Sequence, residues 1–261
     1  MAGTSREQQE PGARRADFGF RRVPAEEHPS LVRGVFDSVA GRYDLMNDLM
    51  SGGLHRLWKQ ALIDWLAPRD GLVLADIAAG TGDIAIRALE RVTRRGGAAE
   101  AILCDPNESM LRIARDRCID AGMVRGPRIV CCAAEALALP DRVAGACTIS
   151  FGLRNATDRP AALAEMRRIL APGGHFLCLE FSPAVLPALA PLYDAYSYNV
   201  LPWLGEHVAD DRDSYRYLAE SIRRFPAPGA LAGEMREAGF GNVHWRAMSA
   251  GIVALHSGWR T

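Results

Sequence analysis

From about residue 72 onward, short apolar runs alternate with longer helix-like segments, and no other feature of the sequence constrains the fold as strongly. The apolar runs cover residues 72–77, 101–104, 128–132, 144–150 and 176–181. Antiparallel neighbours need only short turns, whereas parallel strands need long crossovers that are usually helices. The alternation therefore predicts an α/β fold built on a mostly parallel sheet with right-handed crossovers.

The segment before this alternation has a helical period instead. Within 28–67, apolar residues recur every four positions, and Ser51-Gly52-Gly53 interrupts the pattern, which predicts two helices that form a cap. The first 17 residues are polar and lack the apolar stretch of a secretory signal. They are expected to be a disordered tail, which leaves 18–261 as a single domain.

Local signals mark the ends of two helices inside the alternating part. Asn107 and Asp158 each have a side-chain oxygen that suits an N-cap, and Pro160 is tolerated in the first turn that follows Asp158. The helix after Asp158 is expected to end at Pro172-Gly173-Gly174.

The strand pattern stops over 182–228 and resumes near the end of the chain. This stretch predicts a helical insertion over one end of the sheet. The last apolar runs, near 241–247 and 251–257, are joined by a short link and predict an antiparallel hairpin.

Composition excludes several classes of protein. Hydrophobic residues make up 49% and charged residues 24% of the 261 residues, which argues against a disordered, collagen-like or coiled-coil chain. Lys+Arg and Asp+Glu are both 31, so the net charge of zero gives no reason to expect nucleic-acid binding. Lys59 is the only lysine, which argues against Schiff-base chemistry.

The cysteines and the apolar runs indicate the compartment. The six cysteines form no Cys-x-x-Cys pair and no His/Cys cluster with zinc spacing, so no metal site is expected. No apolar run reaches the roughly 18 residues that a membrane span needs. A cytoplasmic protein in a reducing environment is therefore expected.

A glycine-rich loop follows the first strand of the alternating part and opens a helix. It reads Asp76-Ile-Ala-Ala-Gly80-Thr-Gly82-Asp83, and its glycines lack the Cβ that keeps a ligand away from the backbone. The N-terminus of the following helix offers free N–H groups. A tight strand-to-helix turn without a ligand is the alternative.

Two acidic residues bear on which nucleotide ligand the loop binds. Gly80-x-Gly82-x-x-Ala85 fits a dinucleotide fingerprint, and Asp105 ends the next strand, where a ribose-binding carboxylate belongs. NAD and S-adenosylmethionine both carry an adenosine ribose, so Asp105 does not separate them. Asp76 suits the ammonium and sulfonium of S-adenosylmethionine and would repel the pyrophosphate of NAD. Holding the N–H groups of the loop is the structural alternative for Asp76.

Longer motifs resemble one enzyme family. The segment Tyr43-Asp44-Leu-Met46-Asn47-Asp-Leu-Met-Ser51-Gly-Gly-Leu-His55-Arg-Leu-Trp58 is similar to the first signature of the UbiE-type quinone C-methyltransferases. Four further stretches agree with that family: 150–158, 172–182, 213–221 and 251–256. The resemblance runs from about Phe18 to the end of the chain.

The resemblance implies a fold, a cofactor and a reaction. The fold is the Rossmann-like class I methyltransferase fold, a seven-stranded, mostly parallel sheet with one antiparallel strand. The cofactor is S-adenosyl-L-methionine, and the reaction methylates a ring carbon of a polyprenylated quinol in ubiquinone or menaquinone biosynthesis. The cofactor site, by matching position and from the loop, comprises Asp76, Gly80, Thr81, Gly82, Asp105, Ala133, Ala134 and Ser150.

The chain departs from the family pattern at a few positions. Ala79 stands where the family usually has the first glycine of the loop, and its methyl group requires a negative φ. Ala133 stands where relatives often place Asn, so a side-chain hydrogen bond to the adenine would be lost. Ile169 and Ala171 are conservative or surface changes in the second signature.

The chemistry requires a group that ionises the quinol. A phenol has a pKa near 10, so about 4 kcal/mol must be found to ionise it at pH 7, and a nearby cation supplies much of this. Arg154, after the fourth strand, is the predicted cation, and pairing with Asp158 or Asp44 is its structural alternative. Tyr43 is a candidate for positioning the quinol and His55 for the base, with structural packing as the alternative for both.

The partners and the rival functions follow from the same observations. A prenyl-tailed substrate implies a peripheral membrane contact, for which the stretch 186–204 is one candidate, while a homodimer or a quinone-biosynthetic complex stays open. The rivals are an O- or N-methyltransferase of another small molecule, a NAD-dependent oxidoreductase, and a non-catalytic scaffold. The signature at 43–58 argues against the first of these.

Overall fold

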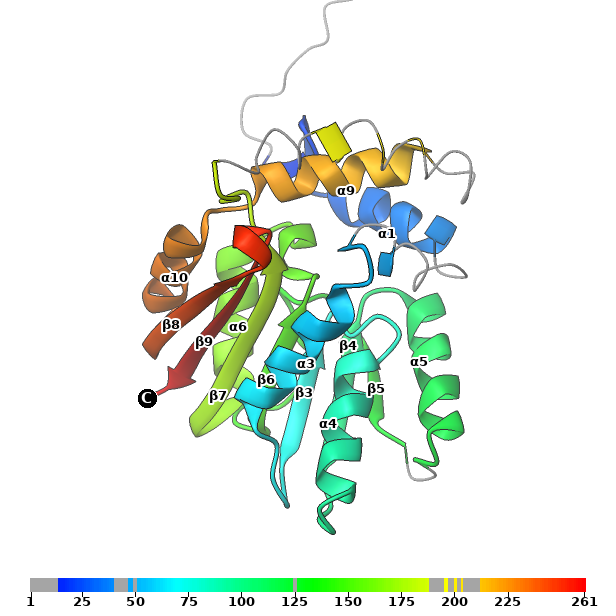
Figure 1. Ribbon diagram of the computed structural model, residues 1–261, viewed down its shortest axis with the longest axis vertical. Coiled ribbons are helices and arrows are strands. Elements are labelled where there is room, and N and C mark those ends of the chain that lie inside the picture. The colour runs from blue at the N-terminus through cyan, green and yellow to red at the C-terminus, as the bar shows by residue number, and fades with distance from the viewer. Residues whose placement is uncertain are drawn as a thin grey trace, which may run out of the picture.

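A single seven-stranded sheet organises the molecule (Figure 1). The computed structural model describes residues 14–39, 47–48, 51–123, 126–187, 195–196, 200, 203 and 212–261. The strands are β3 (Val73–Ile77), β4 (Glu100–Asp105), β5 (Arg128–Cys131), β6 (Ala144–Ser150), β7 (Leu170–Phe181), β8 (Phe240–Met248) and β9 (Val253–Arg260). Their order is β5-β4-β3-β6-β7-β9-β8, and only β9 runs antiparallel to its neighbours. The predicted fold and the closing antiparallel hairpin are confirmed.

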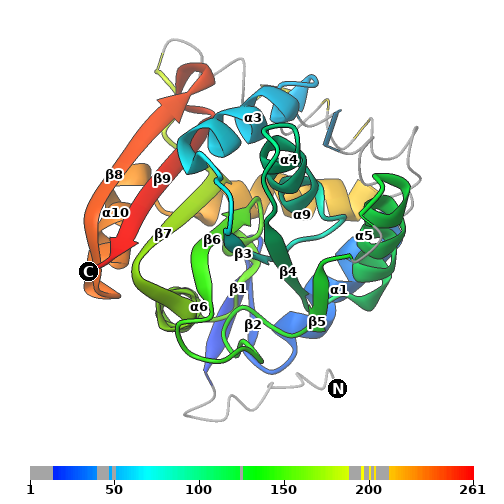
Figure 2. The same cartoon turned by 90° about the horizontal axis from the view of Figure 1, so that it is seen from below.

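Helices cover both faces of the sheet (Figure 2). One face carries α3 (His55–Leu66), α4 (Asp83–Thr93) and α5 (Glu108–Asp120), and the other carries α6 (Arg159–Ile169) and α10 (Pro228–Glu237). Side chains alternate between these faces along each strand, so in β3 Leu74 packs toward α3 while Ala75 and Ile77 pack toward α6.

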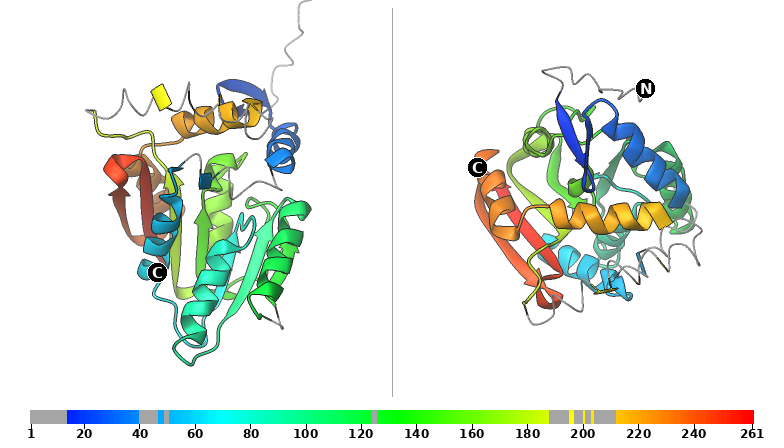
Figure 3. Two further views of the ribbon diagram at one scale, coloured as in Figure 1. Left: turned by 45° about the vertical axis from the view of Figure 1, so that its right-hand side comes forward. Right: turned by 90° about the horizontal axis from the view of Figure 1, so that it is seen from above.

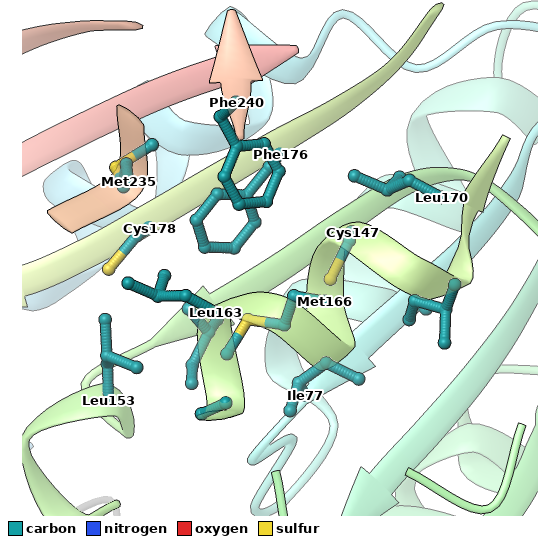
Figure 4. Packing of buried hydrophobic residues seen from close by; sticks show 14 of the residues in the cluster. Ile77, Cys147, Leu153, Leu163, Met166, Leu170, Phe176, Cys178, Met235 and Phe240 are labelled. Carbon is teal, nitrogen blue, oxygen red and sulfur yellow. The ribbon is translucent and has the colours of Figure 1, made fainter. Parts of the chain in front are cut away.

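A large apolar cluster lies beneath α6 and α10 (Figure 4). Phe176 of β7 and Phe240 of β8 stack with ring centroids 4.9 Å apart. Cys147 and Cys178 are buried free thiols in this cluster, where they pack as small hydrophobic side chains.

A third layer lies over the carboxyl ends of the strands, where an open α/β sheet binds ligands (Figure 3). It consists of the hairpin β1 (Arg15–Phe18) and β2 (Arg21–Pro24), the helix α1 (His28–Val39) and the helix α9 (Arg212–Arg224). Phe18 of β1 stacks on Tyr217 of α9 with centroids 4.3 Å apart. This layer positions the roof of the site described below.

Three sequence predictions need correction here. The hairpin was not predicted, and β1 begins at Arg15, inside the expected tail. Its strands have four residues each, too few to show a period in the sequence. Of the helices within 28–67, only α1 lies over the sheet end, because α3 packs on the sheet face. The stretch 186–204 lies largely outside the described residues, and so does the middle of the insertion 182–228, whereas its later part contains the helix α9 over the sheet end.

The third correction concerns the end of α6. The helix ends at Ile169 and β7 starts at Leu170, before the predicted Pro172-Gly173-Gly174. Proline disfavours a helical conformation in the residue before it, so Ala171 is extended. The Arg260 guanidinium donates to the carbonyl oxygens of Arg167, Arg168 and Leu170, which replaces partners lost at the helix end.

None of the described helices has the length and apolar character to cross a membrane.

Candidate active site

A cavity opens at the carboxyl ends of β3, β4, β5 and β6, beneath α1. Its walls include Val32, Phe36, Gly80, Asp105, Met110, Ala133, Ala134, Phe151 and Gly152. Most of these groups are apolar, whereas Asp105 brings a carboxylate and Gly80 a bare backbone. The wall therefore suits a ligand with a flat apolar part and a polar sugar.

Asp105 joins the glycine loop to the next strand end. Its Oδ2 accepts from the Gly80 amide at 2.8 Å and its Oδ1 from the Asn107 amide at 2.8 Å. Burial raises the pKa of Asp105 to about 6, although the two amide donors act in the opposite direction. Each carboxylate oxygen accepts more than one hydrogen bond, so Asp105 can also bind sugar hydroxyls.

The two predicted glycines have different tasks. Gly80 lines the cavity with φ at 54°, a left-handed conformation that favours glycine. Gly82 is the N-cap residue of α4, and a Cβ there would lie 3.2 Å from the Ala114 Cβ of α5. Gly82 therefore lets α5 approach the loop and does not line the cavity.

The cavity wall carries left-handed backbone at two residues that are not glycine. Ala78 follows β3 with φ at 49°, and Phe151 follows β6 with φ at 57°. The φ of Ala79 is not positive. The loop therefore tolerates the alanine methyl group at this position, where the family usually has glycine. Between the strand ends, a Cβ on Gly152 would lie 2.4 Å from the Ala78 Cβ. Such strained backbone is frequent at functional sites.

Asp76 lies behind the loop, outside the cavity wall. It is 1% exposed, its Oδ1 accepts from Thr148 Oγ1 at 2.7 Å, and its Oδ2 has no hydrogen-bond partner in the described part of the chain. Burial raises its pKa to about 7, against the effects of Thr148 and the Lys59 charge. Asp76 is therefore a buried carboxyl group of β3 that is bonded to β6 and does not line this cavity.

The single lysine of the chain supports the same loop. Lys59 of α3 is buried, and its Nζ lies 2.9 Å from Asp83 Oδ2 at the start of α4. Burial would raise the pKa of Asp83, but the charges of Lys59 and Arg87 prevail and lower it to about 2. The ionised Asp83 also stabilises the positive N-terminal end of α4.

The other predicted cofactor residues separate into two groups. Ala133 and Ala134 line the cavity, whereas Thr81 and Ser150 do not. Thr81 Oγ1 accepts from Arg117 at 2.7 Å, which joins the loop to α5. The Ser150 hydroxyl is buried at the end of β6 without a partner among the described residues.

Arg154 occupies a buried ion pair. It lies in a 3₁₀ turn after β6, its side chain is 4% exposed, and its Nη1 lies 2.8 Å from Oε1 of Glu180. Asp158, one of the two partners named from the sequence, pairs with Arg14 instead, and Asp44 lies outside the described residues. The guanidinium also donates to the carbonyl oxygen of Phe151, and its buried Nε has no partner in the described residues. Arg154 therefore holds the turn that carries Phe151, Gly152 and Asn155.

The remaining catalytic candidates are only partly placed. His55 Nε2 lies 2.9 Å from Asp48 Oδ1, and burial lowers the pKa of His55. His55 starts α3 and does not line the cavity, which agrees with the alternative that its role is structural packing. Tyr43 lies outside the described residues.

Two side-chain contacts that were not predicted from the sequence hold α1 over the cavity. At its start, His28 Nδ1 lies 2.8 Å from Thr157 Oγ1, and near its end Asp37 accepts from Asn107 Nδ2 at 2.8 Å. Asn107 was predicted only as an N-cap, and it caps α5 through Met110 as well. The partners of each contact are far apart in the sequence, so local spacing gives no signal for them.

This wall fits S-adenosylmethionine. Asp105 would hold the ribose hydroxyls, the apolar surface of Ala133 and Ala134 would face the adenine, and Gly80 would let the amino-acid part approach the backbone. Ala133 offers no side-chain donor or acceptor, so an adenine hydrogen bond there depends on the backbone.

Solved structures share this architecture. A SAM-dependent methyltransferase from Thermotoga maritima, a possible histamine N-methyltransferase, is 18% identical with a TM-score of 0.62, over 87% of this chain and 99% of that one. The [4+2]-cyclase SpnF is 15% identical with a TM-score of 0.63, over 88% of this chain and 94% of that one. The fold and the cavity define a class I S-adenosylmethionine-dependent methyltransferase.

Comparison of the sequence with known proteins shows which family the chain belongs to. The model of the ubiE/COQ5 methyltransferase family matches residues 23–260, and the chain belongs to that family. A relative from Paracoccus denitrificans, "Ubiquinone/menaquinone biosynthesis C-methyltransferase UbiE", is 54% identical over 93% of this chain and 96% of its own length. A relative of the same name from Methylobacterium nodulans is 54% identical over 94% of this chain and 96% of its own length. The protein is therefore an S-adenosylmethionine-dependent methyltransferase, and the scaffold and oxidoreductase alternatives are set aside.

Replacing Asp105 by alanine is expected to weaken S-adenosylmethionine binding by about 30-fold, which corresponds to about 2 kcal/mol. The substitution removes the charge-assisted hydrogen bonds to the ribose and frees the Gly80 amide. Isothermal titration calorimetry measures the change, with the exposed Asp116→Ala on α5 as the control. Unchanged affinity would show that the ribose is held elsewhere.

Cofactor affinity is also expected to fall with decreasing pH. The carboxylate form of Asp105 accepts from the ribose, and burial raises the pKa of Asp105 to about 6, so protonation removes the acceptor below that pH. The loss approaches about tenfold per pH unit in the acid limit. Calorimetry between about pH 8 and about pH 5 measures it. The Asp105→Asn variant shares the titrating histidines and should lack this component, so an identical profile in that variant would contradict the assignment.

Proposed function

We propose that this enzyme transfers the methyl group of S-adenosylmethionine to a ring carbon of a polyprenylated quinol in ubiquinone or menaquinone biosynthesis. The acceptor is 2-methoxy-6-polyprenyl-1,4-benzoquinol, demethylmenaquinol or both. The supporting observation is the 54% identity over 93% of the chain to a relative named for this reaction. The apolar walls beneath α1 agree with a hydrophobic acceptor.

The sulfonium of the bound cofactor supplies an electrophilic methyl group. The ring carbon would receive this methyl group as the carbon–sulfur bond breaks, and the proton of that ring carbon would pass to solvent. Attack needs an ionised hydroxyl next to the ring carbon, because the phenolate pushes electron density onto it. The residues of this chain must therefore exclude water, orient the ring and stabilise the phenolate.

Two residues of the turn after β6 are suited to the quinol oxygen. Asn155 lines the cavity, and Tyr217 donates to its Oδ1 at 3.0 Å, which leaves the Asn155 amide nitrogen to donate to the substrate. Arg154, next to Asn155 in this turn, lies in the wall of an adjoining cavity, and its buried Nε has no partner in the described residues, so it is the proposed phenolate-stabilising cation. Phe151 provides an apolar wall beside both.

Mass spectrometry of the quinones that accumulate in cells lacking this protein tests the proposal. We expect a quinone that lacks one ring methyl group, and its head group distinguishes the ubiquinone from the menaquinone route. Purified enzyme with a short-tailed quinol and labelled S-adenosylmethionine should place the label on a ring carbon. Label on an oxygen or nitrogen atom, or a normal quinone profile, would overturn the proposal.

The location of the enzyme is part of the same proposal. A polyprenyl tail keeps the substrate in a bilayer, so we place the enzyme in the cytoplasm with a peripheral contact to the inner membrane surface. Contact with a second copy or with other enzymes of the route is compatible with this arrangement.

A further inference from the structure

Positive charge is concentrated on the hairpin formed by β1 and β2. Residues 14–22 contain four arginines and one acidic residue, Asp17, although the whole chain has a net charge of zero. The turn between the strands presents Phe20, which is 49% exposed. Arg224 of α9 lies over the Phe20 ring at 6.0 Å from its centroid. An aromatic side chain surrounded by arginines is thus presented to solvent.

A second cavity lies beneath this hairpin, between β1 and the ends of α6 and α9. Its wall includes Arg14, Arg15, Arg22, Arg154, Arg159 and Arg224. Arg154 and Arg159 are neutralised by Glu180 and Glu234, and Arg14 by Asp158. These ion pairs neutralise the arginines in the inner part of the wall.

The outer arginines are less well compensated. Arg22 and Arg224 share one carboxylate, Asp17, at 3.8 Å and 4.0 Å, both beyond ordinary hydrogen-bond distance. The Arg15 guanidinium donates to the main-chain oxygen of Arg22 and forms no ion pair with a described residue. A second carboxylate, that of Glu220, accepts from the Phe20 main-chain amide at 3.0 Å at the turn. Among the described residues, Asp17 is therefore the carboxylate that pairs with Arg22 and Arg224, and an anion between these two and Arg15 would relieve the excess charge.

The second cavity adjoins the cofactor cavity. Ala156 and Thr157 belong to both walls, and α1, which covers the cofactor, is the element that follows the hairpin. Whatever binds at the hairpin would therefore lie close to the reaction site. The occupant must be anionic and must offer an apolar phase for Phe20.

We propose that Phe20 and the arginines of the hairpin form a binding surface for anionic phospholipid, with the headgroup phosphate beside Arg15, Arg22 and Arg224 and with Phe20 among the acyl chains. One apolar side chain or one basic cluster alone binds a bilayer weakly, whereas the two together give a stable peripheral contact. The proposal rests on the proposed function, because a polyprenyl acceptor gives the enzyme a reason to reach a bilayer.

Sedimentation of the full-length protein with vesicles tests the proposal. We expect binding to vesicles of phosphatidylglycerol, weakened by added salt, and little binding to vesicles of phosphatidylcholine. The double variant Arg22→Gln/Arg224→Gln and the variant Phe20→Ser should each lower the bound fraction by about tenfold. Matched controls on α5 are Arg115→Gln and Ile119→Ser, whose native side chains are 60% and 58% exposed, and they should bind as the unchanged protein does.

Further measurements distinguish the causes of a negative result. Cofactor affinity by calorimetry should be the same in all these variants, which shows that they are folded. Vesicle binding does not depend on turnover, so it can succeed where the quinol proposal fails, and the reverse also holds. Equal binding to both kinds of vesicle, or unchanged binding of both the double variant and Phe20→Ser, would overturn the lipid surface. Displacement from vesicles by inorganic phosphate at matched ionic strength would instead indicate a site for a free anion.

Discussion

Replacing Arg154 by methionine is expected to lower the free energy of unfolding by about 3 to 5 kcal/mol. The substitution leaves the Glu180 carboxylate, 1% exposed, without the charge that balances it. Burial raises the pKa of Glu180 and Arg154 opposes that rise, so the variant is expected to bind a proton there in place of the ion pair. For a chain of this size each kcal/mol shifts the melting temperature by roughly 2 to 4 °C, and thermal unfolding measures the loss.

The same variant bears on catalysis, because Arg154 is also the proposed phenolate-stabilising cation. Adding Glu180→Gln removes the unpaired charge and keeps an acceptor oxygen for one of the two main-chain amides, those of Arg154 and Phe181, which donate to different oxygens of Glu180. Part of the lost stability should therefore return in this double variant. Turnover should stay low, with cofactor affinity nearly unchanged. Recovery of turnover together with stability would instead assign Arg154 to positioning alone.

Arg154 also shows how much of the site could be predicted from the sequence. Its place after the fourth strand follows from the alternation of strands and helices, since parallel strands end at one edge. Its partner Glu180 lies on the neighbouring strand β7, 26 residues away, and no local spacing connects the two. Of the two sequence alternatives, Asp158 is close to Arg154 along the chain, whereas Asp44 belongs to the first signature and lies outside the described residues. Position at a strand end is therefore predictable, whereas the charge partner depends on packing.

The predicted cofactor residues also include some that reach the cavity and others that do not. Gly80 and Asp105 were predicted from the turn and the strand end, and both reach the cavity wall. Asp76 was predicted to meet the cofactor, but it lies behind the wall in contact with Thr148. Successive side chains of a strand point to opposite faces of the sheet, and no feature of the sequence indicated which face Asp76 of β3 would occupy.

The hairpin and the roof helix were the least predictable parts. Strands of four residues have too few positions for an alternation to stand out, so most of β1 was included in the polar tail and β2 was not recognised as a strand. The helical period of α1 was visible, but its place over the cavity depends on His28 and Asp37 meeting partners far along the chain. Tertiary contacts of this kind have no local signature.

Replacing Gly152 by alanine is the second change with a large expected effect. The added Cβ would lie 2.4 Å from the Ala78 Cβ, and Ala78 is already held with φ at 49°. Overpacking of this kind costs about 1 to 3 kcal/mol of stability. Ala78 and Gly152 both line the cavity, so cofactor affinity should fall together with the melting temperature. Calorimetry and thermal unfolding measure the two effects.

A rescue substitution separates the steric cause from a general loss of stability. Ala78→Gly removes the opposing methyl group and suits the positive φ, so the pair Ala78→Gly/Gly152→Ala should recover both cofactor affinity and melting temperature. Gly233→Ala in α10 is the matched control, because a Cβ there meets nothing within 4 Å and the helix gains up to about 1 kcal/mol. If the double variant were no better than Gly152→Ala alone, the contact between these strand ends would not be what shapes the cavity.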